Sequence, residues 1–174
     1  MPTPAYIRIN GTTQGNITQG AFTADSVGNS YQEGHEDQIL VQEIKHRITV
    51  PTDPQSGQPA GQRVHESLTF TCTLNKAVPL LYSALTHGEV LNDVELSWYR
   101  TSIEGIQEHF FTTRLTDAVI VGIDLELPHV QNPANANFTQ FVRVSLAYRR
   151  IDWEHIVAST AAADDWRKPK EVAA

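Results

Sequence analysis

Cysteine is almost absent from this sequence, and its scarcity excludes two kinds of structure. Cys72 is the only cysteine among 174 residues, so the chain has no internal disulfide and no cysteine-based zinc site. Cys72 lies in the segment LTFTCTL, where alternation places it on the same strand face as Phe70 and Leu74. We therefore expect a buried, inert thiol rather than a nucleophile.

Long hydrophobic runs and an excess of positive charge are lacking too. The formal net charge is −7, and the 13 Lys and Arg residues are scattered. An acidic chain without a basic stripe is a poor partner for nucleic acid or an anionic membrane surface. No apolar run approaches the roughly 20 residues that span a bilayer, so we expect no direct membrane insertion. The N-terminal MPTPAYIRIN lacks the pattern of a cleavable signal peptide, which predicts a cytoplasmic protein or one exported without such a signal.

Catalytic and cofactor motifs are also missing. The sequence has no G-x-S-x-G turn, no H-E-x-x-H motif and no glycine-rich phosphate loop. On one continuous strand, His35 and His46 would lie about 35 Å apart, at about 3.3 Å per residue, which is too far for a shared metal ion. Acidic residues two apart, such as Asp93 and Glu95, are more typical of a solvated strand face than of a catalytic pair. We predict no catalytic, metal-binding or cofactor-binding residues, no cofactor and no enzymatic activity.

Alternation of apolar and polar residues dominates what is present, and it predicts β-strands. One segment departs from it: Pro79 suits a first helical turn and Gly88 suits a helix end, which predicts a single helix over about residues 79–87. The pattern predicts a mainly antiparallel β protein with one helix, either a barrel or a sandwich. A short strand is expected near Tyr6, and longer strands are expected over residues 38–50, 63–74, 94–98, 104–115, 117–128 and 138–155.

Some of these strands are apolar on both faces. Ile39, Leu40 and Val41 are consecutive, and Ala118 and Ile120 lie opposite an apolar face of their own strand. A lone barrel needs only one apolar face per strand. The second face must be covered by the helix or by another subunit, so we expect an oligomer.

Several segments in a fixed order carry a resemblance to a known family. They are AYIRINGTTQGNIT, GHEDQILVQEIKHRITVPTD, HESLTFTCTLNKAVPLLYSAL followed by THGEVL, VELSWYR followed by EGIQEHFFTTRLTDAVIVGI, and VRVSLAYRRIDWEH. Together they resemble the haemolysin-coregulated protein (Hcp) family, the tube subunit of the bacterial type VI secretion system. The resemblance extends from about residue 5 to residue 157. It depends on the order and spacing of the segments, because no single motif is specific.

The resemblance implies a two-sheet antiparallel β-barrel with one flanking α-helix. Six copies would form a homohexameric ring with an open lumen, and rings would stack into a tube. A contractile sheath would propel this tube, tipped by a spike, out of the cell, and the lumen would carry effector proteins. The protein would assemble in the cytoplasm and then be secreted without a signal peptide. Residues 1–157 would form one Hcp-like domain, and residues 158–174 a short tail that frays or docks weakly.

The same resemblance gives a role to the proline- and glycine-rich segment 51–62. In this family an extended loop between early strands projects from one ring and contacts the next. We predict ring-stacking contacts for this loop, and the alternative is a flexible surface loop. Its prolines limit the entropy lost on docking, and its glycines permit turns. The residues are Pro51, Thr52, Asp53, Pro54, Gln55, Ser56, Gly57, Gln58, Pro59, Ala60, Gly61 and Gln62.

Two other classes of function stay open at this point. A monomeric β-barrel module that binds a small ligand would have a polar-lined cavity and no ring. A β-sandwich hydrolase would depend on one pair of carboxylates, and its activity would be lost on changing either. The strands with two apolar faces favour the ring over both.

Overall fold

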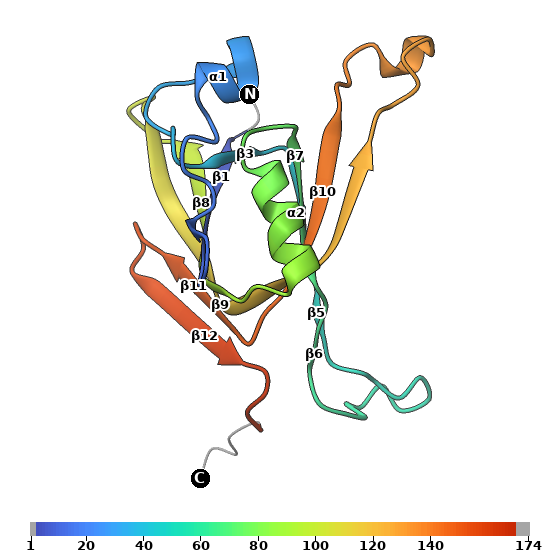
Figure 1. The fold of residues 1–174 in the computed structure, drawn as a ribbon. Helices are drawn as coiled ribbons and strands as arrows, with labels where there is room; N and C mark the ends of the chain where they lie inside the picture. Colours follow the sequence, from blue (N-terminus) through green and yellow to red (C-terminus); the bar gives the residue numbers. More distant parts are fainter. Residues whose placement is uncertain (1–2, 170–174) are drawn as a thin grey trace.

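A computed structural model describes residues 3–169 as a mainly antiparallel β protein with few helices (Figure 1). Ten strands form one large sheet, and two short strands form a separate hairpin. The strands are β1 (Ala5–Gly11), β2 (Gly15–Asn16), β3 (Ile39–Val41), β4 (Glu43–Lys45), β5 (Ile48–Thr49), β6 (Val64–His65), β7 (Leu68–Thr73), β8 (Leu91–Thr101), β9 (Gln107–Glu126), β10 (Phe141–Ala147), β11 (Arg150–His155) and β12 (Thr160–Asp165). The helical elements are α1 (Ala24–Val27), η1 (Gly28–Ser30), α2 (Val78–His87) and η2 (Pro133–Asn135).

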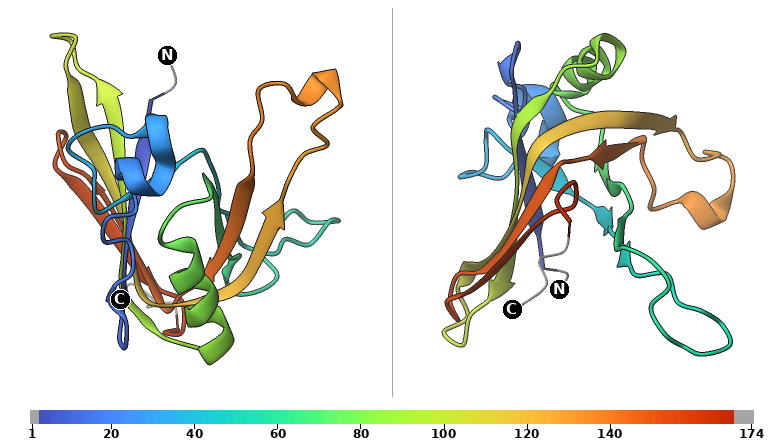
Figure 2. Two further views of the ribbon diagram at one scale, coloured as in Figure 1. Left: turned by 45° about the horizontal axis from the view of Figure 1, so that its top comes forward. Right: turned by 90° about the horizontal axis from the view of Figure 1, so that it is seen from below.

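Strand β9 connects the two halves of the large sheet, whose order is β2-β1-β8-β9-β10-β7-β4. Its first part pairs with β8 and β11, and residues 119–126 pair with β10. Asp117 lies where the partners change and has a φ of 50°, a left-handed conformation that is uncommon for a residue with a side chain. Figure 2 shows the resulting arch of β9 and the wide angle between the half that contains β8 and the half that contains β10.

The single long strand predicted over residues 38–50 is wrong. The segment forms three short strands because each piece has a different partner: β3 pairs with β1, β4 with β7 and β5 with β6. Gln42 separates β3 from β4, and its amide donates to the Thr71 carbonyl at 2.8 Å. A continuous ladder around a closed barrel is not found among residues 3–169. The fold prediction is confirmed as antiparallel sheets with few helices.

The core lies between the two halves of the sheet and α2. Cys72 is fully buried in it, as predicted, and burial raises the pKa of its thiol to about 12. At this pKa the thiol stays protonated at neutral pH and is a poor nucleophile. The largest fully buried side chains are Tyr6, Ile7, Ile9, Ile17, Leu68, Phe70, Leu81, Leu91, Leu96, Leu115, Leu146 and Ile151.

Helix α2 confirms the predicted helix to within one residue. Its N-cap residue makes no side-chain cap, and Asn75 Oδ1 instead accepts the Ala77 amide at 2.9 Å. Pro79 lies in the first turn, and Gly88 ends the helix with a left-handed φ of 64°. Val78, Leu81 and Ala84 face the core.

Part of the C-terminal tail pairs with the sheet. A tail that frays or docks weakly was expected from residue 158, and within the described residues β12 pairs with β11 from Arg150–Asp165 to His155–Thr160. This backbone pairing on the edge of β11 is the contact by which the tail docks. Its small side chains contribute little apolar pattern from which a strand could be predicted.

A buried carboxylate joins the end of α2 to the turn after β1. Glu89 Oε1 accepts the backbone amides of Thr13 and Gln14, both at 2.8 Å. Burial alone would raise the pKa of Glu89, but these hydrogen bonds outweigh it and hold the pKa below its ordinary value. Gly11 is required nearby, because a Cβ there would lie 2.2 Å from Glu89 Oε1.

We predict that Glu89→Ala lowers the free energy of unfolding by about 2 kcal/mol, because two partly buried backbone amides would lose their charged acceptor. Urea unfolding measures this change. The matched control is Gln14→Ala, which removes a side-chain hydrogen bond to the same carboxylate but keeps both backbone ones, and should cost about 1 kcal/mol or less. Equal losses in the two variants would contradict this account.

Candidate functional site

The loop over residues 51–62 projects away from the rest of the molecule. It extends from the β5–β6 hairpin and is the long teal loop at the lower right of Figure 1. The right view of Figure 2 shows it extending away from the sheet. Every residue from 51 to 62 is exposed. The segment proposed from the sequence for contacts between rings therefore presents its whole length to solvent.

Hydrogen bonds within this loop continue the hairpin beyond β5 and β6. The Ala60 amide donates to the Pro51 carbonyl at 2.8 Å, and the Asp53 amide donates to the Gln58 carbonyl at 2.8 Å. Thr52 and Pro59 form an isolated antiparallel bridge between these two contacts. The loop is thus a narrow extension of a hairpin.

The tip of the loop is organised around Asp53. Its carboxylate accepts the Gln55 amide at 2.9 Å and the Ser56 hydroxyl at 3.0 Å, which lowers the pKa of Asp53. Gly57 supplies a φ of 70° and donates its amide to the Asp53 carbonyl at 2.8 Å. A turn of this kind is set by local hydrogen bonds and glycine freedom, so the tip has a defined shape without a partner.

The base of the loop is held by the hydroxyl of Tyr148, in the link between β10 and β11. His46 Nε2 lies 2.6 Å from this hydroxyl, and His65 Nδ1 lies 2.7 Å from it. The histidines flank the two sides of the loop, so one buried hydroxyl ties both sides to the sheet. His65 also contacts Asp164 of β12 through Nε2 at 2.7 Å.

The charge of Asp164 fixes the direction of these hydrogen bonds. The hydrogen bond from Arg63 holds the pKa of Asp164 below its ordinary value, so the carboxylate stays ionised and accepts a hydrogen bond from His65 Nε2–H. Nδ1 of neutral His65 is then an acceptor for the Tyr148 O–H. The pKa of Tyr148 is raised, chiefly by burial, so this hydroxyl stays protonated and accepts in turn from His46 Nε2–H.

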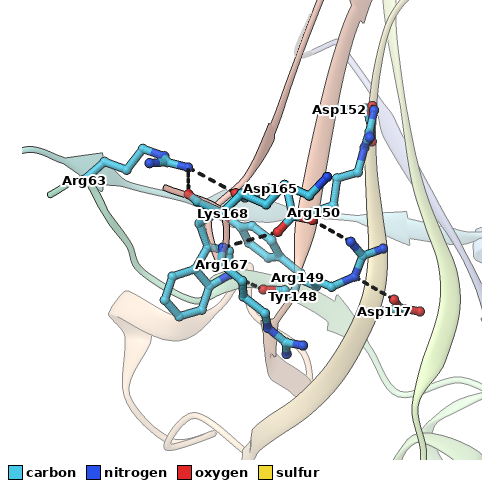
Figure 3. A network of polar contacts seen from close by, with 10 residues as sticks. Arg63, Asp117, Tyr148, Arg149, Arg150, Asp152, Asp165, Arg167 and Lys168 are labelled. Atoms are coloured by element: carbon cyan, nitrogen blue, oxygen red, sulfur yellow. Dashed lines mark hydrogen bonds and ion pairs between the residues drawn. The ribbon is translucent and has the colours of Figure 1, made fainter. Parts of the chain in front are cut away.

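Arginines beside these hydrogen-bonded residues connect the base of the loop to the C-terminal segment (Figure 3). Arg63 donates to Asp164 at 2.5 Å and to the carbonyls of Asp165 and Lys168 at 3.1 and 3.0 Å. The indole N–H of Trp166 donates to the Tyr148 carbonyl. Arg149 binds Asp165 at 2.6 Å and Asp117 at 2.8 Å. The base of the loop, the β9 bend and the tail thus share one polar network.

This network was not found from the sequence. His46 and Tyr148 are 102 positions apart, and His65 and Asp164 are 99 apart. The one available signal was the pair of histidines on either side of the proline-rich loop. That signal gives no indication of a tyrosine between them.

The other residues considered from the sequence lie elsewhere. His35 stacks on Tyr6 with ring centroids 3.7 Å apart, in a different cluster from His46. Asp93 and Glu95 both pair with Arg114. Within residues 3–169, no group of three or more His, Cys, Asp or Glu side chains is arranged to hold a metal ion. No helix in that range is long and apolar enough to cross a membrane.

Comparisons with known proteins point to a single family. A family model described as "Type VI secretion system effector, Hcp" matches residues 6–155. The chain is 56% identical over 169 residues to a "Major exported protein" of Pseudomonas aeruginosa, covering 97% of this chain and 98% of that protein. A crystal structure of an Hcp protein matches with a TM-score of 0.91 and 54% identity over 97% of this chain and 100% of that one. The secreted protein Hcp3 of Pseudomonas aeruginosa matches with a TM-score of 0.82 and 48% identity, over 96% and 100% of the two chains.

We predict that Tyr148→Phe lowers the free energy of unfolding by about 1–3 kcal/mol, because two histidines lose the hydroxyl between them. Denaturant unfolding measures the loss, and limited proteolysis within residues 51–62 should become faster. Tyr31→Phe is the matched control: Tyr31 is exposed and its hydroxyl contacts Glu36, so its removal should leave the free energy of unfolding nearly unchanged. The role assigned to Tyr148 is wrong if the two variants behave alike.

Proposed function

The chain belongs to the Hcp family of type VI secretion proteins, which are secreted structural tube proteins and not enzymes, and we propose that it forms hexameric rings that stack into the tube. In this proposal the rings assemble in the cytoplasm inside a contractile sheath, carry a spike at the tip and effectors in the lumen, and leave the cell without a signal peptide. Residues 1–157 act as one Hcp-like domain, and residues 158–174 are a short C-terminal tail.

An exposed apolar surface supports the ring. Leu125 and Leu127 are 57% and 61% exposed, although Leu125 pairs directly with Val142, which is fully buried. Phe138 and Val130, in the following loop, are 63% and 79% exposed. Exposed apolar side chains gathered on one projection are typical of a protein contact surface.

A second apolar projection lies on the other side of the molecule. Ile103 and Ile106, in the turn between β8 and β9, are fully exposed and 63% exposed. The views in Figures 1 and 2 place this turn and the loop between β9 and β10 on opposite sides of the body. Two unlike surfaces on opposite sides suit a head-to-tail contact, which closes into a ring when the rotation permits. This arrangement is the observation that carries the proposal.

A barrel-like closure of each subunit is part of the same proposal. β3 pairs with β1 at one end of the sheet, and β4 pairs with β7 at the other. Only Gln42 separates these two strands, and its amide also donates to β7. Residues 39–45 therefore supply a bridge between the two halves, which supports a two-sheet barrel around the core.

The loop over residues 51–62 supports stacking between rings. It is exposed, it projects from the body, and its internal hydrogen bonds set its shape before contact. A loop that is ordered in advance loses less conformational entropy on docking than a flexible one. These properties favour the stacking role over a flexible surface loop.

We expect the purified protein to have the mass of a hexamer by light scattering and to show rings by negative-stain electron microscopy. Leu125→Asp combined with Leu127→Asp should shift it to monomers, because charges would replace apolar contacts between subunits. The matched control is Val50→Asp, at an exposed apolar residue near the loop base, which should keep the ring. A wild-type monomer would contradict the ring and favour the small-ligand module. A ring in the double variant would contradict this choice of contact surface.

Deletion of residues 52–60 should leave rings intact and abolish stacked tubes and secretion. Electron microscopy of the purified variant and the amount of protein in the culture medium measure these two effects. Replacing the same residues by a Gly-Ser segment of equal length keeps the reach of the loop but removes its fixed shape, so stacking should be weakened rather than lost. Normal secretion by the deletion strain would refute the stacking role.

A further inference from the structure

We propose that His46, Tyr148, His65 and Asp164 form an acid-sensitive clasp, which fixes the base of the stacking loop at neutral pH and releases it on acidification, so that stacked tubes separate into rings. This inference rests on the proposed function, because the clasp acts through the loop that is assigned to stacking. It adds to that function a condition under which the tube comes apart.

The clasp adds side-chain contacts to the backbone pairing that joins the loop to the body. Within the described chain, residues 51–62 hydrogen-bond only to one another. The β5–β6 hairpin below them has two paired positions, and it continues from the β4–β7 pair through the Glu66 amide, which donates to the Arg47 carbonyl at 3.0 Å. The contacts of His46 and His65 with Tyr148, and of Arg63 and His65 with Asp164, join this hairpin to the sheet and the tail.

The clasp accommodates one protonated imidazole but not two. With both rings neutral, the Tyr148 hydroxyl donates to Nδ1 of His65 and accepts from Nε2–H of His46. With both rings protonated, the two nitrogens that face the hydroxyl are both donors, so the Tyr148 O–H has no acceptor. A proton added to His46 places a positive charge beside His65, across a single oxygen atom.

Other charged groups around the clasp do not cancel this effect. Beyond Tyr148, His46 faces His65 and Glu66, and Glu66 also lies 3.9 Å from Arg47. His65 faces Tyr148, the ring of Trp166 and Asp164, whose Oδ2 already binds Arg63. His65 is enclosed, with 2% of its side chain exposed. A proton on His46 would therefore place a charge beside a poorly solvated ring whose neighbouring carboxylate, Asp164, already binds Arg63.

The sign of the pH dependence follows from His46. Burial, with a smaller contribution from His65, lowers the pKa of His46 below its ordinary value. The unfolded or released chain, with a pKa of about 6.5, then binds more protons than the closed clasp. Closure is therefore most favourable above about pH 6.5 and weakens as the pH falls below that value. The nearby Glu66 carboxylate acts in the opposite direction, but its effect is smaller.

Hydrogen exchange in assembled rings of the full-length protein tests the clasp. We expect amide protection in residues 46–66, corrected for intrinsic exchange rates, to fall at least tenfold between pH 7.5 and pH 5.5. The fraction of protein that sediments as tubes should fall over the same range, while light scattering still gives the mass of the ring. Protection that stays constant over this range would overturn the proposal.

His46→Gln is the diagnostic variant, because its side-chain amide still donates to Tyr148 but gains no proton. It should keep its protection and its tubes at pH 5.5. His87→Gln is the matched control, since His87 is exposed on α2 and contacts only Ser83 and Thr86 of the same helix; it should respond to acid as the wild type does. A His46→Gln protein that releases its loop like the wild type would overturn the clasp.

A second measurement decides the matter if His46→Gln does not fold. The ring signals of His46 in the wild type, followed by NMR, should titrate over the pH range in which the loop is released. Release without titration of His46 would overturn the proposal. Wild-type rings that never stack at pH 7.5 would instead refute the proposed function, and the exchange data would still test the clasp.

Discussion

The bend of β9 is the constraint on which the rest of the structure depends. One 20-residue strand serves both halves of the sheet, so its path sets the angle between β8 and β10. The left-handed residue Asp117 is held by Arg149 at 2.8 Å, and the same guanidinium binds Asp165 at 2.6 Å. Tyr148, the preceding residue, holds the base of the loop. The two-residue link between β10 and β11, Tyr148 and Arg149, therefore contacts the bend of β9, strand β12 and the base of the loop over residues 51–62.

Features that depend on neighbouring residues could be predicted from the sequence, whereas features that depend on contacts between distant residues could not. The helix over residues 79–87 and the buried Cys72 follow from local signals, namely Pro79, Gly88 and a period of two. The strand over 38–50 failed because its pieces change partner within a few residues, and apolar content does not encode partner choice. The pairing of β12 with β11 was not predicted, because it depends on backbone hydrogen bonds and not on an apolar side-chain pattern. The anchor at Tyr148 was inaccessible since its members are far apart in the chain and only the fold brings them together.

The loop is rigid for two different reasons, and the difference matters for its role. At the tip, Asp53 and Gly57 set the shape through contacts a few residues apart. At the base, orientation depends on Asp164 of β12 and on Tyr148 in the link between β10 and β11. Local contacts fix the conformation of the loop, and the distant contacts at the base set its direction relative to the sheet. The proposed stacking, in which each subunit meets the same surface in the next ring, would use both.

Stability alone does not explain why polar side chains, rather than apolar ones, hold the base of the loop. Apolar residues of similar volume often stabilise a buried site as well as or better than a paired charge does, since they avoid the cost of desolvation. A hydrogen-bonded chain has a different property: each of its members requires a neighbour in one position and one protonation state. The Tyr148 hydroxyl accepts from His46 and donates to His65, whose other nitrogen donates to Asp164. This single arrangement of donors and acceptors gives the loop base one orientation at neutral pH. Apolar side chains at the base of the loop would allow a wider range of loop orientations, and their contacts would not depend on pH. The chemistry at this position therefore favours defined orientation and reversibility over maximum stability.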